Sequence, residues 1–158
     1  MSFSSLFKAV FLAVSATTLC SVAHAESTVR APVLEAYTQE CASCHMAYPP
    51  GLLPAASWQR LMGGLNKHYG VDASLDAATT KSLSTWLTNN AGTGKRARSE
   101  PANDRITQAD WFLREHNSRE IPASVWKRPS VGSASNCNAC HAKAAQGDFN
   151  EDQVRIPK

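Results

Sequence analysis

The sequence has no apolar run long enough to span a lipid bilayer, and its charges nearly balance. The apolar run near the N-terminus, Ala9 to Val14, falls well short of the roughly 20 residues that a membrane helix needs. Lysine and arginine number 16 against 13 acidic residues. The basic cluster from Lys95 to Arg98 lies in a loop-like stretch. A nucleic-acid binder would present a concentrated basic face, so we expect no nucleic-acid partner.

The sequence also lacks the residue patterns of the common enzyme classes. We find no acid–base pair, no Ser/His/Asp arrangement and no phosphate-binding glycine loop. The alternation of apolar and polar residues that is typical of strands is missing as well, whereas several segments repeat at three and four residues. We therefore expect a mainly α-helical protein that is not an enzyme.

The first 25 residues are expected to form a secretory signal peptide. A short polar start with Lys8 precedes the apolar run, and small residues end in Ala23-His24-Ala25, which matches the pattern of a cleavage site. Cleavage near Ala25 would also remove Cys20, whose neighbour Leu19 is too bulky for lipid attachment. We expect a periplasmic protein with no membrane span after signal removal.

Cysteine is scarce, and the predicted mature chain keeps only four, all in Cys-x-x-Cys-His motifs. These motifs are Cys41, Cys44 and His45, and Cys137, Cys140 and His141. Disulfides within each motif would close very small loops and stabilise little, and neither they nor a four-cysteine zinc site would use the histidines. Attachment of a c-type haem uses all six residues, because the thiols can form thioethers and the histidine can bind iron. The sequence predicts two covalently attached c-type haems.

The histidine count matches the axial positions of two haem irons. Each iron has two such positions, and only His68 and His116 remain beside the two motif histidines after signal removal. His68 shares an apolar helical stripe with Leu61 and Leu65, and His116 follows Phe112 by one turn. Both histidines are therefore candidate iron ligands, together with His45 and His141.

Two alternatives remain open for the ligand set. Met62 is on the same predicted helix as His68 and could replace a histidine at one iron, whereas Met46 adjoins the motif histidine and is poorly placed. Pairing His45 with His68, and His141 with His116, keeps each ligand in its own half of the chain. A crossed pairing is the other possibility.

The pattern along the chain predicts two small helical haem lobes in one compact chain. Residues 26–91 are expected to form the N-terminal haem lobe and residues 106–158 the C-terminal haem lobe with an extended tail. The stretch from Asn89 to Asp104, "NNAGTGKRARSEPAND", has the composition of a loop, so residues 92–105 are expected to form a linker or loop. Lobes of this size need a staple in addition to their hydrophobic core, and a haem can provide it.

Four helices are expected within these lobes. One runs from Trp58 through His68 and ends near Gly70, and the next begins at Asp72 or Ser74 and stops by Ala91-Gly92. The third runs from Thr107 to His116, with a capping box between Thr107 and Asp110. The fourth carries Cys137 to His141 and stops at Gly147.

Four stretches together resemble the bacterial dihaem cytochrome c family. They are the run from Cys41 to Pro54, "HYGVDASLD" from His68, "WFLREH" from Trp111 and "GDFNEDQVRIP" near the end. The resemblance implies a periplasmic protein with two low-spin bis-histidine haems. It also implies redox partners, because relatives pass electrons to an oxygen-binding monohaem cytochrome and are associated with a membrane b-type cytochrome.

We therefore expect a periplasmic dihaem electron carrier. Irons that are closed by two histidines leave no position for a substrate. One alternative is a haem enzyme or gas binder in which His68 or His116 is not bound to iron, and carbon monoxide binding would reveal it. Another is a dihaem electron-transfer subunit of a periplasmic reductase, which would copurify with its partner.

Overall fold

The protein is mainly α-helical, as the sequence predicts. A computed structural model describes residues 31, 32 and 34–158, so the predicted signal peptide lies outside the described residues. The α-helices are α1 (Glu35–Cys41), α2 (Ala55–Gly63), α3 (Ala77–Asn89), α4 (Asp110–Glu115) and α5 (Ala123–Trp126). Short 3₁₀ turns span Pro50–Leu52, Leu65–Lys67, Gly94–Ala97, Ala102–Asp104, Ile106–Gln108, Cys137–Ala139, Ala144–Gln146 and Glu151–Gln153. The described residues contain no strand, only one isolated bridge between His68 and Val71.

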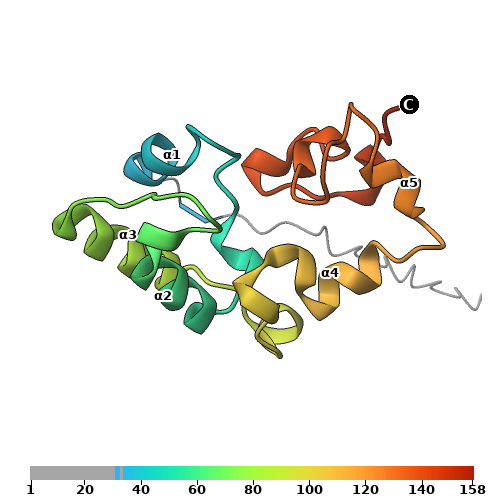
Figure 1. Ribbon diagram of the computed structural model, residues 1–158. Coiled ribbons are helices and arrows are strands. Elements are labelled where there is room, and N and C mark those ends of the chain that lie inside the picture. Colours follow the sequence, from blue (N-terminus) through green and yellow to red (C-terminus); the bar gives the residue numbers. More distant parts are fainter. Residues whose placement is uncertain (1–30, 33) are drawn as a thin grey trace, which may run out of the picture.

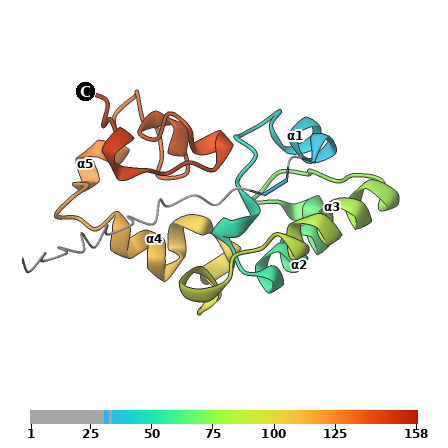
Figure 2. The ribbon, with the colours of Figure 1, turned by 180° about the vertical axis from the view of Figure 1, so that it is seen from behind.

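The two halves of the chain lie on opposite sides of the molecule. Helices α1, α2 and α3 gather on one side, and α4, α5 and the C-terminal turns gather on the other (Figure 1). The view from behind shows the same division (Figure 2). No helix among the described residues is long and apolar enough to cross a membrane.

The best-packed hydrophobic core lies in the first half. Its buried members come from α1, α2, α3 and the segment before α2, and they are Tyr37, Leu53, Trp58, Met62, Leu83 and Leu87. Two polar groups inside this core are hydrogen-bonded to backbone. The indole N–H of Trp58 donates to the carbonyl of Pro50 at 2.8 Å, and the hydroxyl of Tyr37 donates to the backbone carbonyl of Tyr48 at 2.7 Å. The first motif begins at the end of α1 and His68 follows α2, and both helices contribute residues to this core.

The predicted helix from Trp58 through His68 is wrong in its second half. Helix α2 ends at Gly63, a short 3₁₀ turn follows, and His68 lies beyond that turn with ψ 91°. Two consecutive glycines, Gly63 and Gly64, interrupt the apolar stripe, and each weakens a helix by about 1 kcal/mol relative to alanine. Leu61 and Leu65 of the stripe both pack against the hydrophobic core, although no continuous helix joins them.

Helix α3 also begins later than predicted. It starts at Ala77, where the carboxylate of Asp76 accepts hydrogen bonds from the backbone N–H groups of Ala78 and Thr79. The carboxylate of Asp72 instead accepts from the N–H of Ser74 and closes a local turn. Both aspartates can cap a helix, but Asp76 alone occupies the N-cap position of α3.

The second half contains less helix than predicted. The capping box between Thr107 and Asp110 is not formed, because Ala109 is extended and α4 begins at Asp110 without a side-chain cap. The segment from Cys137 to His141 is a single turn, closed by a 2.9 Å bond from the N–H of His141 to the carbonyl of Cys137. Gly147 does end the next turn, with φ 74°.

Gly92 joins α3 to the segment that precedes α2, and alanine should not be tolerated there. Its N–H donates to the carbonyl of Leu53 at 2.7 Å, and an added Cβ would lie 2.6 Å from the carbonyl oxygen of Gly51. Because the obstacle is backbone, Gly92→Ala should destabilise the protein by about 2 kcal/mol or more. Gly63→Ala is the control, since nothing lies within 4 Å of its added Cβ. Equal denaturant midpoints for the two variants would contradict this close approach.

Candidate haem sites

The first predicted pair of ligands, His45 and His68, is brought together by the fold. His45 follows α1 in the turn of the first motif, and His68 follows the 3₁₀ turn after α2. Their rings lie 6.2 Å apart between centroids, at an interplanar angle of 29°. The Nδ1 of His45 lies 2.7 Å from the carbonyl oxygen of Met46. A carbonyl can only accept, so Nδ1 carries the hydrogen and Nε2 keeps a lone pair for a metal.

The second predicted pair, His116 and His141, has the same separation. The rings of His116, at the end of α4, and of His141, in the second motif, lie 6.1 Å apart at 67°. The Nδ1 of His116 lies 3.1 Å from the carbonyl oxygen of Phe112, and the ring of Phe112 stacks on the imidazole at 4.1 Å. The shared face predicted for Phe112 and His116 is thereby confirmed, and Nε2 of His116 is left for a metal.

These separations fit one iron between each pair. A metal–imidazole nitrogen bond is about 2 Å long, and a ring centre lies roughly 1 Å beyond the bonded nitrogen, so two opposed imidazoles have centroids about 6 Å apart. The two close pairs are those within each half of the chain. Met62, the competing candidate, lies in the protein core and is only 8% exposed.

The environment of two of these histidines favours the neutral, metal-binding form. Burial lowers the pKa of His68, with further lowering from His45 and Arg105. Burial also lowers the pKa of His141, with a contribution from His116. In both rings Nδ1 is buried and has no hydrogen-bond partner in the described part of the chain. If a metal were bound through Nε2, Nδ1 would be the protonated nitrogen of each ring.

The four cysteines are free thiols in the structure. Burial raises the pKa of Cys41 and of Cys137 to about 11, so neither thiol has the low pKa of a redox-active dithiol. No group of three or more His, Cys, Asp or Glu side chains among the described residues is arranged to hold a metal ion by itself. This argues against a four-cysteine zinc site and leaves the thiols available for thioether bonds.

A cavity of about 750 Å³ lies beside the second motif. This volume is in the range of cofactor pockets. Its lining includes Cys137, Cys140, His116 and His141, with apolar residues from several segments. The residues present therefore fit a haem at this site.

Some residues around the sites were not predicted as such. Phe149 packs edge-on against His141 at 5.4 Å, whereas Tyr48, which was expected to pack around a haem, stacks on His45 at 4.9 Å. Lys95 and Arg96, predicted as a solvated loop, line the cavity, and the guanidinium of Arg96 lies 5.6 Å from the ring centre of Trp111. Aromatic residues close to the motifs in the sequence could be expected to pack near the haems. Nothing in the sequence indicated that the two basic residues lie there, because they are far from the second motif along the chain.

Comparison with known proteins gives a consistent result. The family model for dihaem cytochrome c matches residues 37–149. The diheme cytochrome type c from Shewanella baltica OS155 is 41% identical, with 77% of this chain and 91% of that chain covered and a TM-score of 0.67. Diheme cytochrome c from Rhodobacter sphaeroides is 39% identical, with 74% and 97% covered and a TM-score of 0.66. No curated protein matches the chain.

Proposed function

The chain belongs to the dihaem cytochrome c family. On that premise we propose that it carries electrons through two haem irons, each coordinated by two of its own histidines. The ligands are His45 with His68, and His116 with His141. Thioethers from Cys41 and Cys44 hold the first haem, and thioethers from Cys137 and Cys140 hold the second. The observation that carries the proposal is the pair of imidazole separations, 6.2 and 6.1 Å.

Irons with no free coordination position would restrict the chemistry to electron transfer. Each haem supplies an iron that alternates between the ferric and ferrous states when bound. If the four histidines bind the two irons in these pairs, no coordination site would be left open to dioxygen or peroxide. The carbonyl groups of Met46 and Phe112 orient two of the imidazoles, and this fixed orientation limits ligand movement when the charge of the iron changes.

The location and the partners belong to the same proposal. The predicted signal peptide supports a periplasmic location, where c-type haems are attached. Electron transfer requires redox partner proteins, and we propose an oxygen-binding monohaem cytochrome as acceptor and a membrane b-type cytochrome as associated partner. The support for both is the resemblance of the motif stretches to the family.

Spectroscopy of the purified protein tests the proposal directly. The ferric protein should show only low-spin iron by electron paramagnetic resonance. Its mass should exceed that of the polypeptide by two haems after denaturation. The ferrous protein should bind carbon monoxide only very slowly at neutral pH, because a histidine must first dissociate from its iron. A high-spin signal, ready carbon monoxide binding or a single attached haem would overturn the proposal and favour a gas binder or haem enzyme.

A further inference from the structure

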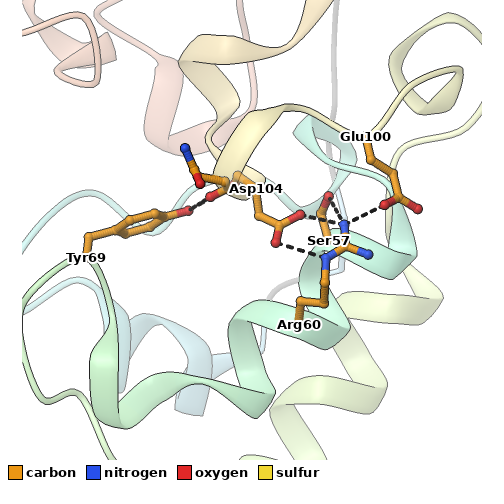
Figure 3. A network of polar contacts seen from close by, with 6 residues as sticks. Ser57, Arg60, Tyr69, Glu100 and Asp104 are labelled. Carbon is orange, nitrogen blue, oxygen red and sulfur yellow. Dashed lines mark hydrogen bonds and ion pairs between the residues drawn. The ribbon is translucent and has the colours of Figure 1, made fainter.

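We propose that Tyr69 and Asp104 form a clamp that holds His68 in position at the first haem. The proposal rests on the ligand role of His68 proposed above. In the described part of the chain, the non-glycine residues with positive φ are Tyr69, Asn103 and Asp104, at 50°, 54° and 55°. The hydroxyl of Tyr69, the residue after His68, lies against the backbone of the other two, and Figure 3 shows Tyr69 beside Asp104. Strained backbone that gathers around a functional residue is a sign of positioning.

The turn after His68 is the first part of the clamp. The N–H of Val71 donates to the carbonyl of His68 at 3.0 Å, and the two residues between them, Tyr69 and Gly70, have φ of 50° and 96°. Positive φ at both central positions is typical of a type I′ turn, which favours Gly, Asn or Asp. A bulky tyrosine at the first central position is unfavourable. The surrounding contacts must therefore hold it there.

Tyr69 is anchored at both its hydroxyl and its ring. The hydroxyl lies 3.0 Å from the carbonyl oxygen of Asn103 and 3.0 Å from that of Asp104. The guanidinium of Arg105 lies 4.0 Å from the ring centre, within the range of a cation–π contact. These contacts fix the side chain although 42% of the residue is exposed. The ring in turn packs against His68 at 4.9 Å.

Asp104 is itself fastened to α2. Its two carboxylate oxygens accept hydrogen bonds from Nε and Nη2 of Arg60, at 3.0 and 2.6 Å. This forked geometry is the strongest form of the pair. The pairing with Arg60 holds the pKa of Asp104 below its usual range. Figure 3 shows the continuous path from Arg60 through Asp104 to Tyr69. Since Trp58 and Met62 of the same helix lie in the core, the path connects His68 to the rigid part of the fold.

Carbon monoxide binding by the ferrous holoprotein tests the clamp. The gas reaches an iron only while its histidine is dissociated, so the rate reports the population of that state. Tyr69→Phe removes the hydroxyl and keeps the ring. It should raise the rate at the first haem roughly threefold to tenfold, as expected for losing one or two partly exposed hydrogen bonds. Asp104→Asn, which loses its charge, should act in the same direction.

Two controls distinguish positioning from general loosening. The second haem of the same molecule should keep the wild-type rate, with His68→Ala and His116→Ala supplying the reference spectra of each opened site. Glu100→Gln removes the charge of a second acidic partner of Arg60, a half-exposed carboxylate at 2.7 Å, and should change neither rate because exposed ion pairs contribute little.

The clamp is refuted if Tyr69→Phe binds carbon monoxide at the wild-type rate, or if both haems of the variant accelerate equally. If Asp104→Asn fails to fold, Tyr69→Phe alone decides. Failure of the proposed carrier function would look different, since the wild-type protein itself would then bind the gas readily.

Discussion

His68→Ala and His116→Ala should each convert one of the two irons into a site that binds carbon monoxide. Each variant loses one axial ligand and keeps both thioethers of that haem, so the iron is left with an open position. We expect about one carbon monoxide per molecule and a high-spin ferric signal from one haem, with the other haem low-spin. Gas titration with optical detection and electron paramagnetic resonance measure both effects.

Met62→Leu is the matched control for the first haem. Methionine was the alternative ligand, and leucine has a similar volume but no sulfur to bind iron. The Met62 side chain lies in the core with Trp58 and Leu87, so this substitution should cost less than about 1.5 kcal/mol of stability and leave both irons closed. If Met62→Leu opened an iron and His68→Ala did not, the assignment of His68 would be wrong.

The chemistry of the sites could be predicted from the sequence because it depends on very short spacings. A Cys-x-x-Cys-His motif places its thiols and its imidazole within one turn, and the bond from His141 to Cys137 forms that turn without a longer helix. The proposed second ligand of each pair required only a count of histidines and the assumption that all were used. Neither step depended on the path of the chain between the motifs.

Helix boundaries and contacts across the chain were less predictable. Apolar residues can keep their helical spacing across a break in the helix. The spacing from Trp58 to His68 therefore did not predict that α2 ends at the two glycines. The hydroxyl of Tyr48 donates to the carbonyl of Ser135 at 2.8 Å across 87 positions. Such pairs carry no local pattern, and they form only once both halves have folded. The clamp on His68 was not predicted for the same reason, because its parts come from α2, the turn after His68 and residues 103–105.

Exchanging Cys137 and Cys140 together for alanine should unfold much of residues 106–158 while leaving the core of the first half intact. The buried apolar residues of the second half are few and mostly small: Ala109, Phe112, Val125, Val131 and Ala144. One of them, Phe112, lines the cavity of about 750 Å³ beside the second motif. A region with so thin a core cannot offset the conformational entropy of its ordered residues without the group that fills it.

The first half should respond differently because Tyr37, Trp58 and Leu83 belong to a continuous core. Limited proteolysis and hydrogen exchange of the double variant, which should retain one attached haem, should show protection lost between residues 106 and 158 and kept in α2 and α3. Asn138→Ala is the control, since it alters an exposed residue of the same motif and keeps both thiols and His141. Wild-type protection in the second half of the double variant would show that its polypeptide core is sufficient by itself.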